Sequence, residues 1–572
     1  MLNNEIARIF EDLADRLEIS GANSFRIRAY RQAAKTLSEW PDPLENIALT
    51  DRVKLLAIPG VGKDLADKIV VICETQSLPQ LEEMRLAVPD GVVDMLRIPG
   101  LGPKKAAMLF QELKVISLSD LRQAVIAGQV AKLKGFGEKT AKSILEGLER
   151  AELIGTRAYM AEAKADADAI VESLQCLPSI GQVSAAGSLR RRKETVGDLD
   201  ILATASNATL VMDTLAAHPL VAQVLARGDT KQRVRLKSGL ELDLRVVPEE
   251  SYGAAMQYFT GSKEHNIVVR RRAQERGLKI NEYGVYRGET SIAGRAEEEV
   301  YAAVGLPWIP PELRENRGEI ERAATGHLPQ LIEVADIQGD LHMHTTATDG
   351  TATIREMVLA AKSRGLKYIA ITDHSQRVSM ANGLNADRLR QHWQEIDKVR
   401  SQISGIEVLR GIECDILEDG TLDLDDQVLS EADWVIAVLH YGLRQPREQI
   451  DRRLLNAIHN PHVSIIGHPS ARIINKRPPV AWSFETILQA AAEQGVMLEI
   501  NASYQRLDLD DIQAAAARDR GIPIVISTDA HSTGGLDSME YGVYQARRAG
   551  LCQADVANTL PFEDFRKRIR GK

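Results

Sequence analysis

Residues 187–200 read GSLRRRKETVGDLD, and this stretch ends in Asp198 and Asp200, two aspartates separated by one residue. Side chains two positions apart on a β-strand point to the same face, so we expect these two carboxylates to lie side by side. Asp243, in the alternating segment 240–247 (LELDLRVV), adds a third carboxylate from a second strand. Three clustered carboxylates predict a Mg²⁺ site, because Mg²⁺ prefers oxygen ligands and two such ions can clamp the oxygens of a phosphoryl transfer.

The start of the same stretch, Gly187-Ser188, offers backbone N–H groups and a hydroxyl to a polyphosphate. Either motif alone is more typical of a turn or of a solvated strand edge. Together with the carboxylates, the pair predicts a site for phosphate chemistry.

A glycine pattern recurs three times in the first 150 residues, as IPGVG (58–62), IPGLG (98–102) and LKGFG (133–137). Each copy precedes apolar residues at helical spacing, so the glycines permit a tight turn and the next helix can aim its free N–H groups at a DNA phosphate. One copy would be typical of an ordinary capped helix connection. Three copies predict DNA binding that ignores base sequence and weakens steeply with salt. The residues expected to carry it are Gly60, Gly62, Gly100, Gly102, Gly135 and Gly137.

The last two fifths of the chain hold nine of its twelve histidines, and most of them follow an apolar run. Apolar strands alternating with helices predict a parallel α/β sheet, and a barrel of this kind places its active site at the carboxyl ends of its strands. Imidazole and carboxylate ligands without thiolate favour Mn²⁺, Zn²⁺ or Fe²⁺, which can activate water for attack on a phosphodiester. The polar residues at or after the strands are His342, His344, His374, Glu413, His440, His468, Asp529 and His531.

Composition limits the protein class. The 572 residues and 63.0 kDa are too many for one core, and 44% hydrophobic content is typical of a globular protein. No apolar run of about 18 residues and no signal-peptide pattern occurs, so we expect a soluble cytoplasmic, nucleoid-associated protein without a membrane partner. The four cysteines form no C-x-x-C pair, which excludes a disulfide framework or a thiolate metal site. The net charge of −9 argues against a DNA-coating protein but allows basic strips such as 190–193 and 270–272 to meet phosphates.

Over roughly residues 1–310, the order of these motifs resembles the palm and thumb of family X DNA polymerases, of which polymerase beta is the best-known type. The stretch 187–200 is followed by Asp243, by YFTGS at 258–262 and by INEY at 280–283. The resemblance implies that Asp198 and Asp200 bind two Mg²⁺ ions and that Asp243 binds the catalytic one. It also implies contacts with the incoming nucleotide, from its triphosphate to its base, by Gly187, Ser188, Arg191, Gly197, Tyr258, Phe259, Gly261 and Asn266.

Three positions depart from polymerase beta, and one further match is specific to its lyase domain. Glu241 stands where that relative has an arginine beside the third aspartate, so support for Asp243 must come from elsewhere. Ile267 replaces a template-contacting lysine, and Arg26 stands where that relative has another lysine. Lys68 matches the lysine that forms a Schiff base with an abasic sugar. Lyase activity at Lys68 and a surface or phosphate-binding role both stay open, because nothing in the sequence shows a lowered pKa.

Residues 339–572 resemble the polymerase-and-histidinol-phosphatase (PHP) domain. The pattern His-x-His, Asp349, Thr-Asp-His, Gly-Ile-Glu, His440, Gly-His-Pro, Asp-x-His contains all nine expected ligands, namely the eight polar residues above and Asp349. The resemblance implies a distorted (β/α)7 barrel that holds three ions, with Mn²⁺ or Zn²⁺ expected. Fused behind a family X polymerase, such a domain commonly acts as a 3′–5′ exonuclease, and in some members it also cuts at abasic sites. His392, His459 and His462 fall outside the pattern and are interpreted as surface or packing residues.

We therefore expect a bacterial or archaeal DNA repair enzyme, a monomer that fills short gaps in base excision repair and trims 3′ ends. Its expected partners are gapped or primer–template DNA and deoxynucleoside triphosphates. Two alternatives stay open: a phosphoesterase acting on small phosphorylated metabolites with a non-catalytic DNA-binding front half, and a protein that only bridges DNA ends. The expected fold is multidomain α and α/β. Its expected parts are a lyase-like helical domain (1–80), a fingers-like helix-hairpin-helix domain (81–150), a nucleotidyltransferase palm (151–250), a thumb (251–312), a linker (313–338) and the PHP barrel (339–572).

Overall fold

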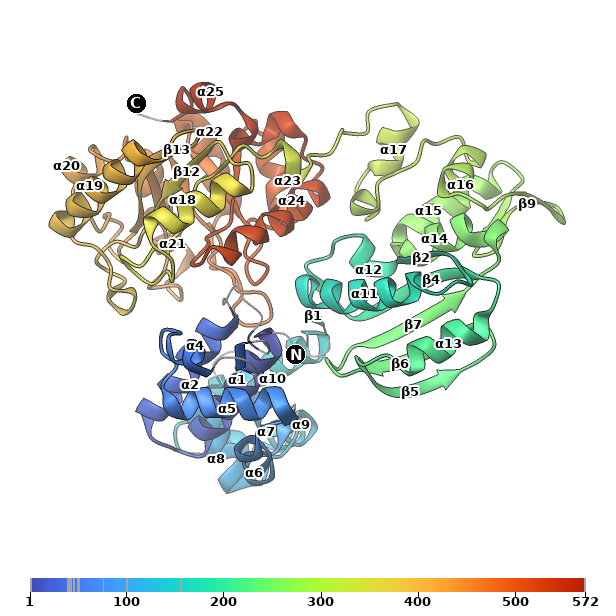
Figure 1. Ribbon diagram of the computed structural model, residues 1–572, viewed down its shortest axis with the longest axis horizontal. Helices are drawn as coiled ribbons and strands as arrows, with labels where there is room; N and C mark the ends of the chain where they lie inside the picture. Colours follow the sequence, from blue (N-terminus) through green and yellow to red (C-terminus); the bar gives the residue numbers. More distant parts are fainter. Residues whose placement is uncertain are drawn as a thin grey trace.

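The computed structural model describes residues 3–38, 44, 47–48, 52–75, 77–98, 101–154 and 157–569. Figure 1 shows a helical N-terminal part, a green palm and thumb, and a yellow-to-red barrel. None of the helices in these ranges is both long and apolar enough to cross a lipid bilayer.

The N-terminal part is entirely helical in its described residues and contains two separate apolar cores. One core runs from Ile6 to Leu81 and the other, apart from Ile19, from Val88 to Leu148. Each core is small, which agrees with short helices joined by tight glycine turns. The helices are α1 (Asn3–Ile19), α2 (Ser24–Ser38), α4 (Arg52–Leu56), α5 (Lys63–Thr75), α6 (Pro79–Ala87), α7 (Asp90–Asp94), α8 (Pro103–Leu113), α9 (Leu118–Ile126) and α10 (Glu138–Ile154).

The palm is a five-stranded sheet in the order β2-β4-β7-β6-β5, in which only β4 and β7 run parallel. Leu242, Leu244 and Val246 are buried, as the alternation in 240–247 predicts, and helices α11 and α13 contribute to the same core. Its elements are β1 (Ala158–Tyr159), α11 (Met160–Gln175), β2 (Ile180–Ala185), α12 (Gly187–Arg190), β3 (Thr195–Val196), β4 (Asp198–Ala205), α13 (Ala208–Ala216), β5 (Val221–Arg227), β6 (Lys231–Leu236) and β7 (Glu241–Val246).

The thumb follows as helices around a three-stranded sheet in the order β10-β9-β8. A chain segment with one short helix, α17 (Glu319–Ala324), then leads to the barrel. The thumb elements are α14 (Tyr252–Thr260), α15 (Lys263–Gln274), β8 (Lys279–Asn281), β9 (Gly284–Arg287), β10 (Thr290–Ala293) and α16 (Glu297–Ala303).

The C-terminal part is a barrel of seven parallel strands whose spatial order is the order along the chain, β11 to β17. A parallel bridge between Met343 and Ala530 connects the first and last strands, so the barrel is nearly closed. The strands are β11 (Gly339–Asp340), β12 (Tyr368–Ile371), β13 (Glu407–Asp415), β14 (Trp434–Val438), β15 (Ile465–Ile466), β16 (Met497–Asn501) and β17 (Ile524–Ser527). The helices are α18 (Ile354–Ser363), α19 (Ala386–Gln402), α20 (Asp426–Leu429), α21 (Arg447–His459), α22 (Phe484–Gln494), α23 (Asp511–Asp519), α24 (Met539–Arg548) and α25 (Phe562–Arg566).

The inside of the barrel is apolar at the end where the strands begin. Tyr368 and Trp434, the first residues of β12 and β14, are fully buried there and pack against Phe565 of α25. This end is therefore filled, and polar chemistry is confined to the opposite end, where the strands finish.

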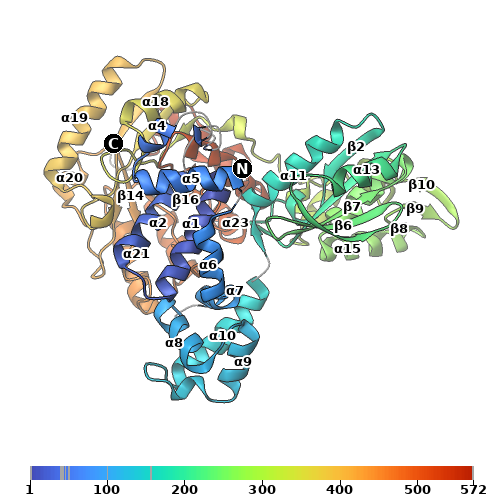
Figure 2. The same ribbon diagram turned by 60° about the horizontal axis from the view of Figure 1, so that its bottom comes forward.

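The three parts touch one another. Figures 1 and 2 place the N-terminal helices next to the barrel, where the Lys35 ammonium lies 3.4 Å from an Asp349 carboxylate oxygen. The Tyr159 hydroxyl, on the palm, donates a hydrogen bond of 2.8 Å to the carbonyl of Ile474 in the barrel. Tyr544 of α24 packs against the palm core.

Candidate active sites

The palm aspartates lie on neighbouring parallel strands. Asp200 on β4 is directly beside Asp243 on β7, and Asp198 is beside Glu241. Burial, reinforced by the negative charges of Asp198 and Asp243, raises the pKa of Asp200 to about 6. This accumulation of negative charge is what a bound cation would relieve.

Asp243 has a cationic partner on its other side. Arg233, its neighbour on β6, donates two hydrogen bonds to the carboxylate, at 2.9 and 2.8 Å. This bidentate contact holds the pKa of Asp243 below its usual range. The Glu241 carboxylate accepts a hydrogen bond of 2.9 Å from Arg235. Support for Asp243 thus comes from the adjacent strand and not from its own.

A cavity of about 920 Å³ opens beside these aspartates, between the palm, the thumb and the barrel. A Cβ at Gly187 would lie 2.4 Å from an Asp200 carboxylate oxygen, and the residue has φ +64°, so the chain can turn here only with glycine. The sequence-predicted residues that line the cavity are Gly187, Ser188, Arg191, Asp198, Asp200, Tyr258, Phe259, Gly261 and Asn266.

Local contacts fix the side chains of this cavity. The Arg191 guanidinium donates to the Thr260 carbonyl at 2.5 Å and to Glu315 at 3.1 Å. The Asn266 amide donates to the Tyr258 carbonyl at 2.8 Å and accepts from Gln257 at 2.7 Å. These contacts hold the thumb residues against the palm and leave the cavity between them open.

A second, larger groove of about 1460 Å³ adjoins the first cavity. It is lined by all three parts of the molecule, including Gly102 of the second hairpin, Asp198 of the palm and Tyr504 of the barrel. Gly197, predicted as a nucleotide contact, lines this groove and not the first cavity.

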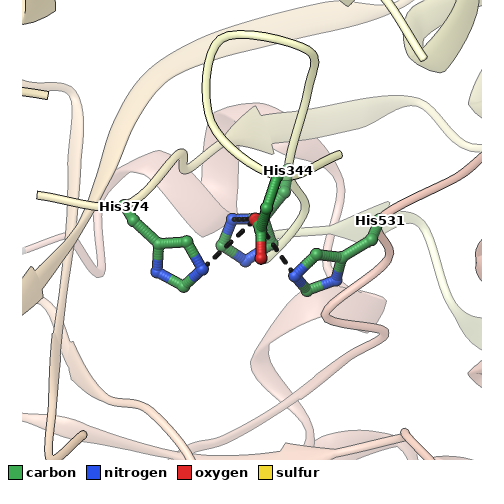
Figure 3. Close-up of side chains that lie close together, drawn as sticks. His344, His374 and His531 are labelled. Carbon is green, nitrogen blue, oxygen red and sulfur yellow. Dashed lines mark ion pairs between the residues drawn. The ribbon is translucent and has the colours of Figure 1, made fainter. Parts of the chain in front are cut away.

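The nine sequence-predicted barrel residues come together at the end where the strands finish. Figure 3 shows His344, His374 and His531 directed toward one another; His374 and His531 each lie 3.4 Å from an Asp349 carboxylate oxygen. His468 Nε2 is 3.0 Å from a Glu413 carboxylate oxygen. Within the described ranges, the groups of three or more residues with ligand atoms within 4.8 Å of one another all lie here. They are His344, Asp349, His374 and His531; His342, His344 and Asp529; and His374, Glu413 and His440.

The barrel cluster has the properties of a metal centre. Burial, with the neighbouring His531 and His374, lowers the pKa of His344 to about 4, so its imidazole is neutral and able to bind a metal ion near pH 7. Buried ligand atoms that lack a hydrogen-bond partner include His342 Nε2, His344 Nδ1, Asp349 Oδ1 and Glu413 Oε2. Orphaned buried polar atoms of this kind are rare in proteins and fit a site for divalent cations.

Sequence reasoning missed the carboxylates that orient these imidazoles. Glu499 of β16 lies 2.7 Å from His342 Nδ1 and accepts the backbone N–H of His468 at 2.6 Å. Asp415, at the end of β13, lies 3.1 Å from His440 Nδ1. Such partners fix the tautomer and the ring orientation of a metal-binding histidine. Both follow apolar strand residues, the same signal that identified the ligands.

His392 also belongs to this support. It is buried, and its Nε2 lies 2.9 Å from Asp373, whose other contacts are Thr345 and Thr348. These threonines belong to the loop that carries Asp349. The interpretation of His392 as a surface or packing residue was therefore incomplete, because its polar partner comes from a different strand end.

The hairpin glycines lie at the turns that the sequence predicts. Gly62, Gly102 and Gly137 immediately precede α5, α8 and α10. Gly60 and Gly135 have φ +80° and +87°, and Gly100 lies outside the described residues.

Lys68 on α5 forms an ion pair with Asp64, and its ammonium lies 5.7 Å from the centre of the Tyr30 ring.

Comparison with known proteins covers both the polymerase-like part and the barrel. Residues 255–315 match the DNA polymerase beta thumb family and 340–503 the PHP domain family; 1–78 match a helix-hairpin-helix domain and 92–150 a SAM-like helix-hairpin-helix tandem. The chain is 39% identical over 568 residues to the DNA polymerase/3'-5' exonuclease PolX of Bacillus subtilis (strain 168), covering 99% of this chain and 98% of the relative. The probable phosphatase TTE1963 of Caldanaerobacter subterraneus is 34% identical over 249 residues, which is 41% of this chain and 93% of that protein.

Proposed function

Because this chain belongs to the PolX family of DNA polymerase/3'-5' exonucleases, we propose that it fills short gaps during DNA repair and trims damaged or mispaired 3′ ends. It is a DNA polymerase of family X with a PHP-domain exonuclease, and it binds DNA and deoxynucleoside triphosphates. Both activities require divalent metal ions. The observation that carries the proposal is that one chain places carboxylates on adjacent strands of the palm and groups imidazoles with carboxylates at the strand ends of the barrel.

In the palm, we assign the incoming nucleotide to the 920 Å³ cavity. Ser188 and Arg191 bind its triphosphate, Tyr258 and Phe259 exclude a ribose 2′-hydroxyl, and Asn266 contacts the base. Asp198, Asp200 and Asp243 would hold two Mg²⁺ ions, which would supply charge neutralisation at the α-phosphate and at the pyrophosphate. The protein's own contribution is chiefly to position the nucleotide and the primer end.

In the barrel, the nine predicted ligands would hold three ions, with Mn²⁺ or Zn²⁺ suited to imidazole and carboxylate. The ions supply activated water and charge neutralisation at the phosphodiester. Glu499 and Asp415 orient the imidazoles of His342 and His440, so the ligands are in place before DNA arrives.

The hairpin glycines bring helix N-termini to the DNA backbone, which allows DNA binding without base recognition. Lys68 forms an ion pair with Asp64 on α5, the helix that follows the first hairpin. We therefore assign Lys68 to the DNA backbone in preference to a lyase step.

Primer extension and 3′ digestion on a one-nucleotide gap test the proposal with Asp200→Ala and His342→Ala. The first variant should lose at least about a thousandfold in extension, since metal ligands contribute several kcal/mol to the transition state, and should retain digestion. The second should do the reverse. If the unmodified chain incorporates no deoxynucleotide, or if one substitution abolishes both activities in a protein of unchanged melting temperature, the proposal fails.

A further inference from the structure

A cation from the N-terminal helical part reaches the metal-binding cluster of the barrel. The Lys35 ammonium, on α2, lies 3.4 Å from Oδ2 of Asp349. Among the described residues, two lysine or arginine side chains come within 4.0 Å of a carboxylate of the cluster. The other one, Arg506 at 3.7 Å from Asp529, belongs to the barrel itself. Lys35 is therefore a charge that a separate part of the chain brings to this site.

The two carboxylate oxygens of Asp349 have different partners. Oδ1 lies 3.4 Å from His374 and 3.4 Å from His531, on the side of the other predicted ligands. Oδ2 is the oxygen that Lys35 contacts. The Asp349 side chain is 24% exposed, more than that of any other predicted ligand of the cluster. Lys35 thus lies at the outer edge of the cluster and does not take the place of an ion between the imidazoles.

Helix α2 presents a basic face. It contains four basic residues and no acidic one. Arg28, Arg31 and Lys35 are spaced by three and four residues, so they share one side of the helix, and all three are exposed. Tyr30 and Leu37 lie on the other side, in the apolar core.

This basic face leads from the shared groove to the barrel cluster. Arg31 lines the groove between the helical part, the palm and the barrel. Lys35 follows one turn later, about 6 Å further along the helix. Figures 1 and 2 show α2 on the side of the helical part that faces the barrel. A DNA strand that passes from the groove to the cluster therefore meets positive charge along its path.

The position of Lys35 fits a phosphate group of such a strand. The predicted metal ligands are mostly buried at the strand ends of the barrel, so a phosphodiester reaches them while the neighbouring phosphates stay at the edge of the site. A lysine ammonium has three N–H donors, so Lys35 can keep its ion pair with Asp349 and still donate to a phosphate oxygen. The Lys35 side chain is 46% exposed, which leaves it accessible to DNA.

We infer that Lys35 binds the phosphate next to the scissile one when the 3′ end of a DNA strand lies at the barrel cluster. The basic face of α2 formed by Arg31 and Lys35 guides the strand to this position. The helical part then supplies a substrate-binding residue for degradation, in addition to its hairpins. The inference rests on the proposed exonuclease site in the barrel.

The test is Lys35→Met in the full-length chain, with digestion of a single-stranded 3′ tail. Few cations lie at this end of the strand, so loss of one charge-assisted contact should raise KM for the tail about fivefold, with kcat little changed. The slope of log KM against log salt concentration should fall by about 0.7, the value for one phosphate contact on a single strand. Gap filling should change by less than about twofold, and Lys35→Arg should restore most of the affinity for the tail.

A small phosphodiester separates DNA binding from an effect on Asp349. Bis(p-nitrophenyl) phosphate has one phosphate and no neighbours, so its hydrolysis by Lys35→Met should equal that of the unmodified chain. The metal content after dialysis should also be unchanged. If hydrolysis of this ester and metal content both fall, Lys35 only orients Asp349, and the inference is overturned.

The matched control is Arg85→Met. Arg85 belongs to the same helical part, is paired with Asp12 at 3.1 Å and lines neither cavity. Its side chain is 45% exposed, close to the value for Lys35, and its loss should leave KM for the tail and the salt slope unchanged. Arg31→Met should raise KM for the tail less than Lys35→Met does, because Arg31 is also paired with Asp15 and Glu18.

The outcomes separate two failures. If His342→Ala digests the tail as fast as the unmodified chain, the proposed exonuclease site is wrong. If His342→Ala is inactive in digestion but Lys35→Met has an unchanged KM and salt slope, the inference about Lys35 is wrong. Faster digestion by Lys35→Met would show that the ammonium obstructs the site and would also overturn the inference.

Discussion

The palm triad and the barrel cluster hold ions in different ways. Each palm aspartate is at least partly exposed. The Asp243 carboxylate accepts a hydrogen bond from Arg233. In the barrel, His342, His344 and Glu413 are almost completely buried, and Glu499 fixes one imidazole from behind. The palm site is therefore completed by what the nucleotide brings, whereas the barrel site is assembled by the protein itself.

This difference follows from the side chains that each sheet presents at its edge. Three carboxylates on adjacent strands repel one another, so bound cations would stabilise their site. Imidazoles mixed with carboxylates tolerate burial, because groups of both signs share the space. A transient substrate suits the first arrangement and resident ions suit the second.

The strongest test of the barrel as a preorganised site is Glu499→Gln. Loss of this carboxylate behind His342 should lower both metal content and exonuclease rate by about 10- to 100-fold, with polymerisation unchanged. Metal analysis after dialysis and a digestion assay measure the two effects. Glu493→Gln, on the exposed face of α22, provides the control; equal losses in both variants would contradict preorganisation by Glu499.

The palm counterpart is Arg233→Gln. Without the two hydrogen bonds from Arg233, Asp243 loses its fixed orientation, and we expect kcat for nucleotide addition to fall about tenfold. Arg235→Gln is the matched control, because Arg235 lies on the same strand and contacts Glu241. An unchanged kcat in Arg233→Gln would show that the metal ions alone orient Asp243.

A pH titration of Mg²⁺ binding should distinguish the two sites further. Asp200 has its pKa raised to about 6, so below pH 6 protons compete with Mg²⁺ for this carboxylate. Affinity should be constant above pH 7 and weaken by up to about tenfold for each pH unit below 6. Calorimetric titration of His342→Ala, in which the barrel cluster is disrupted, measures the palm alone; a pH-independent affinity between 5 and 7 would refute the carboxylate assignment.

The smallest effect is expected at Lys68. With its ammonium paired to Asp64, Lys68→Met should change gap filling by less than about twofold and remove no covalent activity, because a single phosphate contact contributes little. Borohydride trapping on an abasic substrate is the decisive measurement. A trapped complex that disappears in Lys68→Met would show that Lys68 carries out the lyase reaction.

Sequence patterns predicted which polar residues lie close together better than they predicted the contacts that support them. Asp198 and Asp200, or His342 and His344, are recognisable because two-residue spacing and strand ends are local properties of the chain. Arg233 could not be assigned to Asp243 in advance, because their pairing depends on the register of β6 against β7. His392 and Asp373 are likewise joined only by the packing of α19 against the barrel. Contacts between separate parts of the chain, such as the hydrogen bond from Arg548 to the Arg191 carbonyl, cannot be recognised from the sequence.

The groove shared by the helical part, the palm and the barrel has a kinetic consequence. Asp198 and Tyr504 both line it, so a DNA end bound there would contact both the palm and the barrel. We expect extension and removal to compete within such a complex, with a ratio that does not depend on enzyme concentration.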